Sequence, residues 1–304
     1  MNGRASIRFA FAILIVIANL LLFTATSAET IDLRLRLTEG QTFKLMLTTV
    51  NSGSATLKNQ AANTVETAKV GMVFNVERVE SDGSAQMKVT FDNPTYTAST
   101  AGQVVAEQLM AAVSKAFSAL NGRSFKIEVT QTGVVRNLTG LNAATSAALQ
   151  SLAGQPEAMR ALAEMIFAQT MSEPIWKHAM SSVFSMIPDH PVAVGERWSR
   201  QLAFSAPSGG QQSVTYYKIL ERSNGISKIK IYSEIKSAER MGGPSVKLAF
   251  TGIAEGTAEI DEATGLVVRA YSTANLKGKT TEAVGKSGST GSLTMRSSSS
   301  IERY

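Results

Sequence analysis

Short runs in which apolar and polar residues alternate recur along most of this chain, and they constrain its fold more than any other feature. Such runs occupy residues 31–37, 70–76, 87–91, 125–129, 214–220 and 246–250. A period of two is typical of half-buried strands. Asp82-Gly83 and Asn224-Gly225 separate consecutive runs and favour hairpin turns, because both residue types tolerate positive φ. We expect residues 31–37 and 43–49 to pair as a hairpin, and the small polar residues 51–62 to form a loop or hairpin tip.

Three sequence landmarks occur in the same order in both halves of the chain. The first matches Gly40-Gln41-Thr42-Phe43 with Gly195-Glu196-Arg197-Trp198, and the second matches Phe74-x-Val76 with Tyr217-x-Ile219. The third matches Thr132-Gly133 with Thr264-Gly265, with one residue of slip. Chance resemblance is the alternative, since such turns are common. The order favours an internal repeat, with Phe43 and Trp198 at equivalent buried positions.

Helical periodicity appears in two places between the strands. Apolar residues of 103–120 fit one helical stripe, and Asn121-Gly122 is a typical helix end. Residues 141–186 are also helical, with a break at Gly154-Gln155-Pro156 and a new start at Ser172 and Pro174. These elements together predict an α+β fold of two related, curved antiparallel β units, half-barrel or sandwich-like, with a helical segment between them.

The first residues have the three parts of a secretory signal peptide. Arg4 and Arg8 precede an apolar run from Phe9 to Phe23, and Ala28 ends a small-residue cleavage sequence. The run is shorter than the roughly 20 residues of a membrane span. We therefore expect cleavage near Ala28 and no integral membrane protein afterwards. The predicted organisation is a signal peptide at 1–28, a β-rich unit with one helix at 29–140, a helical segment at 141–187 and a second β-rich unit at 188–304.

The composition excludes several classes of site. The absence of cysteine excludes disulfides, thiolate metal sites and cysteine nucleophiles, and in an exported chain it favours a bacterial envelope, in the periplasm or outside the cell. The net charge of +6 is spread along the chain, without the clustered lysines and arginines of a nucleic-acid-binding protein. We therefore expect no nucleic-acid partner.

The Leu-rich first run, leading into Gly40-x-x-Phe43, and the central Pro191-Val192-x-Val194-Gly195-x-x-Trp198 resemble an exported bacterial family of unknown function. Members of that family usually carry a signal peptide or a lipid anchor. The resemblance implies an envelope protein and supplies no catalytic residues. This chain lacks the lipid-accepting cysteine of some members, which implies a soluble form.

No catalytic or metal-binding constellation emerges from the motifs. His178 and His190 are the two histidines, and His178 lies within a helical stretch. Asp189 precedes His190, and such a pair can orient a general base, but no Gly-x-Ser-x-Gly nucleophile turn is present. The sequence has neither His-Glu-x-x-His nor a calcium-binding loop. We expect no metal, no cofactor and no enzymatic activity, although paired carboxylates from distant positions are not detectable in a sequence.

Three functional interpretations remain open. The first is an exported, non-catalytic envelope protein that binds an apolar or amphipathic ligand such as a lipid. The second is a structural or interaction protein of the envelope without a pocket. The third is a hydrolase of unrecognised type. In the first case the ligand borders the Met-rich helical segment, whose residues 156–187 are expected to lay one face, including Leu162, against a sheet. The candidate pocket residues are Met159, Ile166, Trp176, Met180, Phe184 and Trp198.

Overall fold

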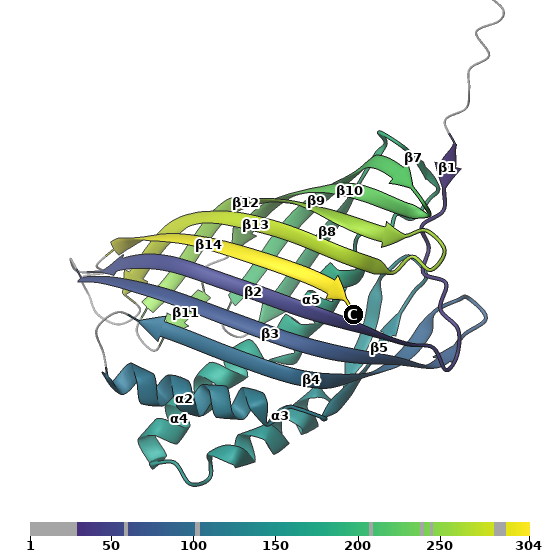
Figure 1. The fold of residues 1–304 in the computed structure, drawn as a ribbon. Coiled ribbons are helices and arrows are strands. Elements are labelled where there is room, and N and C mark those ends of the chain that lie inside the picture. Colours follow the sequence, from purple (N-terminus) through teal and green to yellow (C-terminus); the bar gives the residue numbers. More distant parts are fainter. Residues whose placement is uncertain are drawn as a thin grey trace, which may run out of the picture. The chain divides into compact units, whose positions relative to one another are not determined.

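One large antiparallel sheet dominates the computed structural model (Figure 1). The structure describes residues 29–57, 60–100, 104–206, 209–237, 240–243, 246–282 and 290–304. The strands are β1 (Thr30–Ile31), β2 (Thr42–Leu57), β3 (Gln60–Val79), β4 (Ala85–Thr100), β5 (Ser124–Val129), β6 (Val135–Thr139), β7 (Val192–Ala193), β8 (Arg197–Ala206), β9 (Gly209–Ser223), β10 (Ile226–Ser237), β11 (Arg240–Gly243), β12 (Val246–Asp261), β13 (Val267–Glu282) and β14 (Thr290–Arg303).

The strands form two meanders that share one sheet. The order is β6-β5-β4-β3-β2-β14-β13-β12-β10-β9-β8, with β11 paired to β12. Pairing between β14 and β2 joins the halves. The predicted α+β class and curved antiparallel sheets are confirmed, and the two expected β units are the two meanders. The sheet is open, because its edge strands β6 and β8 do not pair with each other in the described residues.

The first two landmarks of the repeat have the same geometry in both halves. Phe43 pairs with Phe74 across β2 and β3, and Trp198 pairs with Tyr217 across β8 and β9. The rings stack in both pairs, with centroids 4.7 and 5.5 Å apart. Phe43 and Trp198 are each 7% exposed. The expected equivalence of these two positions is therefore confirmed.

The backbone around each pair repeats as well. Gly40 N donates to Val76 O at 2.9 Å, and Gly195 N donates to Ile219 O at 2.9 Å. Both glycines have positive φ, 80° and 89°, a conformation that residues with a Cβ rarely adopt. The same tight turn thus leads into β2 and β8.

The third landmark explains the one-residue slip. Thr130 N donates to Val134 O in the β5–β6 turn, and Asp261 N donates to Leu266 O in the β12–β13 turn, both at 3.0 Å. The second turn spans one residue more between its bonded ends. Gly133 occupies the left-handed region in the shorter turn.

The expected hairpin between residues 31–37 and 43–49 is wrong. Residues 32–41 contain no strand, although Leu33 and Leu35 are buried as their alternation predicts. The segment instead crosses two turns at one end of the sheet. Leu35 N donates to Gln131 O at 2.8 Å, and Arg36 N donates to Thr264 O at 2.9 Å. The alternation of apolar and polar residues in this segment thus reflects an extended backbone that bonds to turns of both halves and not a strand of the sheet.

The two alternatives at 51–62 are a loop and a hairpin tip. The loop is wrong, because β2 continues to Leu57 and β3 begins at Gln60. The hairpin is confirmed, because the two strands pair as far as Leu57 and Gln60. Small polar side chains do not interrupt a strand when the neighbouring backbones satisfy the hydrogen bonds, as β3 and β14 do here for β2.

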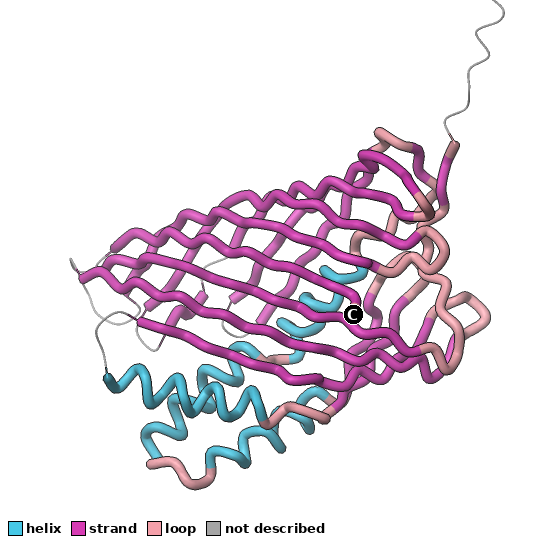
Figure 2. Tube along the Cα trace, in the orientation of Figure 1, coloured by secondary structure: helices cyan, strands magenta, loops and turns pink. Residues whose placement is uncertain are grey.

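Four α-helices accompany the sheet in the described residues (Figure 2). They are α2 (Val104–Ser118), α3 (Leu141–Leu149), α4 (Glu157–Thr170) and α5 (Glu173–Phe184). α2 packs on β4 and α4, whereas α5 lies against both edge strands, β6 and β8. The expected helices are confirmed, including the start of α5, where Ser172 is the N-cap and a proline stands in the first turn.

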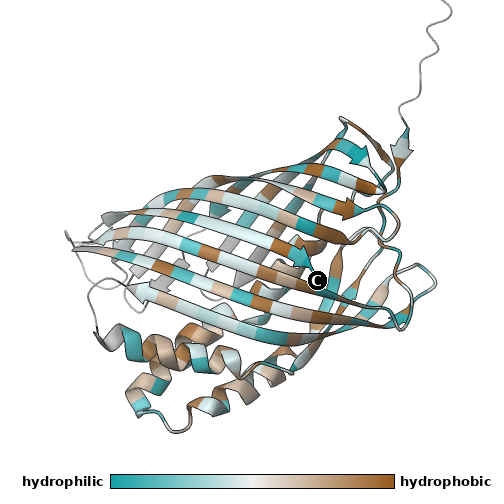
Figure 3. Cartoon of the chain, viewed as in Figure 1, coloured by the Kyte–Doolittle hydropathy of each residue, from teal (hydrophilic) through white to brown (hydrophobic). Residues whose placement is uncertain are grey.

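The core is concentrated toward the end of the sheet that holds the C-terminus of β14 (Figure 3). The largest fully buried side chains include Phe74, Phe91 and Phe125 of this region. Farther along the strands, inward-facing positions of β2 and β14 carry Thr, Asn and Ser. The inward face thus passes from the aromatic core to a stretch of small polar residues, and a second apolar cluster with Phe250 and Leu276 lies beyond it.

Candidate functional site

A half-open cavity of about 310 Å³ lies between α5 and the concave face of the sheet, chiefly over the second meander. Six residues of α5 and the turn after it form one wall: His178, Ala179, Ser182, Val183, Ser185 and Met186. The facing wall comes from β2, β8, β9, β10, β13 and β14. Its size is at the lower end of the range typical of small-molecule pockets. We call this space the inner cavity.

The lining combines aliphatic side chains with hydroxyl groups. Leu202, Ile231 and Ile301 are among the aliphatic members, and Ser213, Thr215 and Ser233 are among the hydroxyl members. These three hydroxyl side chains are at least nine-tenths buried. The lining contains no Asp, Glu, Lys or Arg in the described residues. Such a wall suits an uncharged group that is mostly apolar and accepts a few hydrogen bonds.

Hydrogen bonds fix the hydroxyl groups of this wall. Thr215 Oγ1 and Ser233 Oγ lie 2.8 Å apart, and Ser185 Oγ and Tyr217 OH lie 2.7 Å apart. Burial raises the pKa of Tyr217 to about 12, so the phenol stays neutral at physiological pH. The hydroxyl groups in both pairs can each form additional hydrogen bonds, which a polar group of a ligand could use.

A second space of about 830 Å³ adjoins the inner cavity, and we call it the outer cavity. It is lined by residues of α3, α4, α5 and β8, and His178 and Leu202 line both cavities. Burial lowers the pKa of His178, which favours the neutral imidazole. Glu173 and Lys177 stand among its lining residues, so this cavity has charged groups that the inner one lacks. The two spaces thus adjoin each other and are both mostly apolar, and among the described residues only the outer one is bordered by charged side chains.

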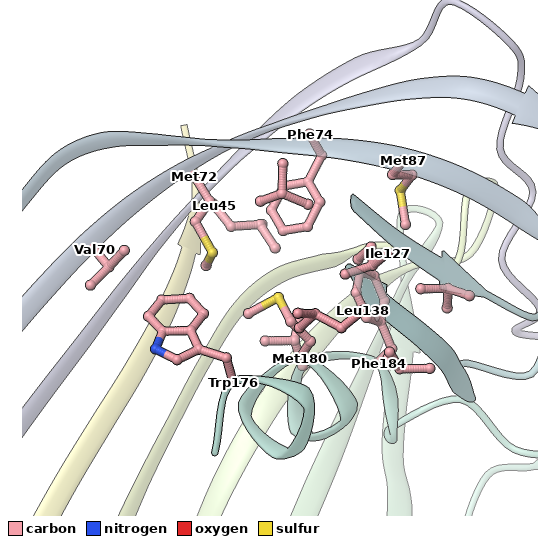
Figure 4. Packing of buried hydrophobic residues seen from close by; sticks show 14 of the residues in the cluster. Leu45, Val70, Met72, Phe74, Met87, Ile127, Leu138, Trp176, Met180 and Phe184 are labelled. Atoms are coloured by element: carbon pink, nitrogen blue, oxygen red, sulfur yellow. The ribbon is translucent and has the colours of Figure 1, made fainter. Parts of the chain in front are cut away.

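The position of α5 creates both cavities. Trp176, Met180 and Phe184 recur every four residues and point toward side chains of the first meander, including Met72 and Phe74 (Figure 4). Trp176 packs edge-to-face on Phe91, with ring centroids 5.2 Å apart. His178, Ala179, Ser182 and Val183, which line the inner cavity, lie on the neighbouring face of the helix. α5 thus fills the first meander and leaves space over the second.

Polar contacts hold α5 at the sheet edges. Lys177 Nζ donates to Arg136 O of β6 at 2.8 Å, and Arg200 Nη2 of β8 donates to Ile187 O at 2.8 Å. Arg200 also reaches Thr132 O, at 3.4 Å. The arginine therefore links the second edge of the sheet to the β5–β6 turn of the first.

The six residues expected near a pocket occupy three environments. Trp176, Met180 and Phe184 are buried in the core on the side of α5 away from the inner cavity. Trp198 is buried in its stacked pair, and Met159 and Ile166 on α4 are half-buried. The described linings of the two cavities include none of the six. Leu162 is 41% exposed, so its expected place on a sheet-facing side is wrong.

The Asp189–His190 pair forms a short ionic network near the start of β8. His190 Nδ1 lies 2.7 Å from Asp189 Oδ1, and His190 Nε2 lies 3.2 Å from Glu196 Oε1. These hydrogen bonds raise the pKa of His190 and lower that of Asp189, whereas the pKa of Glu196 is lowered first by the Ala193 N–H that it accepts and then by His190. Because both ring nitrogens are bonded to carboxylates, the network secures the turn before Trp198.

Metal-binding clusters and membrane-spanning helices are absent from the described part of the chain. No group of three or more His, Asp or Glu side chains there has the arrangement of a metal site. None of its helices combines the length and apolar character needed to cross a membrane.

Sequence reasoning missed the hydroxyl residues of the cavity. They occupy inward-facing positions of β9 and β10, whereas outward-facing Tyr216 and Leu220 are 42% and 39% exposed. The repeat contains a usable signal, because extending its alignment along the strands places serine or threonine opposite large apolar residues of the first half.

Several comparisons with known proteins complete the description. The fold is similar to a chain of lipovitellin (TM-score 0.44, 8% identity, 88% of this chain and 25% of that chain covered). A weaker similarity is found to an outer membrane channel from Pseudomonas putida F1 (TM-score 0.24, 8% identity, 89% of this chain and 98% of that chain covered). The chain thus spans about a quarter of the lipovitellin chain. A search of curated proteins finds no match.

A family model matches more than half of the chain, over residues 82–267, from the β3–β4 turn to the start of β13. The chain therefore belongs to a family of unknown function, DUF6263.

Proposed function

We propose that this protein is an exported, non-catalytic envelope protein that binds an apolar or amphipathic ligand in the inner cavity. The observation that carries the proposal is a difference between the two meanders. Strand register makes Leu45, Met72 and Phe91 consecutive neighbours across the first meander. The matching trio in the second is Arg200, Thr215 and Ser233.

The difference in residue type at these matched positions supports a ligand site over a closed core. In the first half, Met72 and Phe91 fill the interior and contact the core face of α5. In the second half, Thr215 and Ser233 replace them and border the cavity. A chain that only needed a closed core would gain roughly 0.8 kcal/mol for each further buried methylene group. Small hydroxyl residues forgo that gain and supply hydrogen-bonding groups, as expected for a binding wall.

The two cavities favour an amphipathic ligand in one orientation. Its apolar portion occupies the uncharged inner cavity, and its polar portion extends past His178 toward Glu173 and Lys177 in the outer cavity. The signal-peptide pattern and the lack of cysteine support export to a bacterial envelope, where amphipathic molecules are abundant. A structural protein without a pocket is the second candidate, favoured by the dense packing of α5 on the first meander.

Native mass spectrometry of protein purified from its host tests the proposal. Wild-type protein is expected to carry a bound small molecule. Thr215→Met with Ser233→Phe gives the second half the residues of the first, and it is expected to lose the molecule while remaining folded. Ser223→Phe with Thr251→Met makes the same changes at exposed positions of β9 and β12 and serves as the control. Unliganded wild-type protein, or a filled variant that keeps its ligand, contradicts the proposal.

A further inference from the structure

A row of positive charges crosses the outer face of the second meander. Lys218 of β9 pairs in register with Arg197 of β8 on one side and with Lys230 of β10 on the other. Neighbouring strands are about 4.8 Å apart, so three cations lie within about 10 Å. Like charges directly opposite each other destabilise a sheet. This arrangement therefore needs a reason beyond folding.

Two other cations on the same face are paired with carboxylates. Lys228 Nζ lies 3.1 Å from Glu221, and Arg269 Nη2 lies 2.6 Å from Glu259. In the described residues, none of the three row cations has an acidic partner within ion-pair distance. The row thus presents three positive charges that no carboxylate of the described chain neutralises.

Two tyrosines stand beside the cations in the next row. Tyr216 and Tyr232 pair in register across β9 and β10, with ring centroids 6.2 Å apart and a tilt of 40°. Tyr216 is 42% exposed. Both rings line a surface groove of about 370 Å³ together with Arg197, Lys218 and Lys230. The groove therefore combines aromatic faces with unneutralised positive charge.

Acidic residues limit what this groove can accept. Glu255 pairs in register with Tyr232, and Glu234 follows two residues later on the same face of β10. On the other side of the cation row lie the paired carboxylates of Glu221 and Glu259. A long polyanion or an anionic bilayer would meet these carboxylates, whereas a small anion would contact only the cations.

We propose that the groove binds a sugar unit that carries a phosphate or carboxylate group. The anionic group contacts Arg197, Lys218 and Lys230, and the sugar ring stacks on Tyr216 and Tyr232. Carboxylates accept hydrogen bonds from hydroxyl groups, so Glu255 holds the ring hydroxyls. The site lies on the outer face of the sheet and is independent of the inner cavity.

Isothermal titration calorimetry on the full protein tests this assignment. The ligands are glucose 1-phosphate and digalacturonate, compared with glucose, inorganic phosphate and vesicles of phosphatidylglycerol and phosphatidylcholine. At least one anionic sugar is expected to bind tenfold or more tightly than either glucose or phosphate. Affinity should fall as salt increases, because the row is exposed.

Variants locate the binding. Lys218→Gln with Lys230→Gln, and separately Tyr232→Ala, are each expected to weaken the anionic sugar at least tenfold. Lys228→Gln, at a paired lysine on the same face, serves as the control and should leave affinity within twofold. The proposal is overturned if neither sugar binds, if phosphate binds as tightly, if the vesicles bind and the sugars do not, or if the control weakens binding as much as the paired change.

Discussion

Substitutions at matched positions of the two meanders should change stability by very different amounts. Phe91 in the first meander is 1% exposed, and its ring packs against Phe125 and Trp176 at centroid distances of 5.3 and 5.2 Å. Phe91→Ala is expected to lower the free energy of unfolding by about 3–5 kcal/mol. Ser233, at the matching position of the second meander, borders the inner cavity instead.

Ser233→Phe adds a phenyl group where there is space for it. Burying the ring contributes roughly 1.5–3 kcal/mol, and leaving the Thr215 hydroxyl without its partner costs roughly 1–3 kcal/mol. The net change is therefore expected to lie within about 1.5 kcal/mol of wild type. If the second meander were closely packed instead, the inserted ring would strain its neighbours and lower the free energy of unfolding by roughly a further 1–3 kcal/mol.

Equilibrium urea unfolding of ligand-free protein, followed by tryptophan fluorescence, measures both changes. The slope of the unfolding free energy against urea concentration should be the same for both variants and wild type, so that differences in the midpoint report differences in stability. A loss above about 3 kcal/mol for Ser233→Phe would mean that the second meander is closely packed. A loss below about 1 kcal/mol for Phe91→Ala would remove the contrast between the halves on which the proposed function depends.

Three further predictions concern the turn beside α5, the ionic network and export. Gly133→Ala should lower the free energy of unfolding by at least about 1–3 kcal/mol in thermal or urea unfolding, because φ is 77° and the new Cβ would meet Phe184 O at 2.0 Å. Gly154→Ala, with no atom within 4 Å of its Cβ, should change stability little, and equal effects would contradict the reasoning. The raised pKa of His190 means that its stabilising contribution is complete below the unfolded-state pKa near 6.5 and disappears as pH rises through the folded-state pKa. Unfolding free energies measured from pH 5 to 9 should therefore show a smaller decline for His190→Gln than for wild type, and identical profiles would count against the network. N-terminal sequencing of protein from the envelope fraction should begin near Glu29, and an intact N-terminus would contradict export with cleavage.

The sequence predicted the parts of the fold that depend on local patterns. Alternation located the strands, and Pro174 together with Ser172 located the start of α5. The repeat predicted that Phe43 and Trp198 are equivalent, because a buried aromatic residue after a positive-φ glycine leaves a recognisable pattern. These signals lie within a few residues of each other along the chain.

Features that depend on distant contacts were not predictable in this way. Leu33 and Leu35 alternate like a paired strand, yet the backbone N–H groups of Leu35 and Arg36 donate to turns about 100 and 230 residues away. The groove on the outer face needs the register of β8, β9 and β10, which brings Arg197, Lys218 and Lys230 together. Alternation gives the face on which a residue lies but not its neighbours across strands.

The inner cavity required both kinds of information. Its hydroxyl residues are visible in the sequence once the repeat is extended along the strands. Their meaning depends on α5, which turns its large side chains toward the first meander and leaves small ones facing Thr215 and Ser233. Helical periodicity indicates two faces of α5 but not which of them meets which half of the sheet.

A crystal structure of the protein purified from its host is the most direct test of the central claim. The proposed function predicts continuous electron density for a small molecule between α5 and the second meander, in contact with Leu202, Thr215 and Ser233. It also predicts that the polar end of this density lies beside His178, toward Lys177. A cavity that contains only water, or a bound molecule elsewhere on the protein with this space closed by side chains, would contradict the claim.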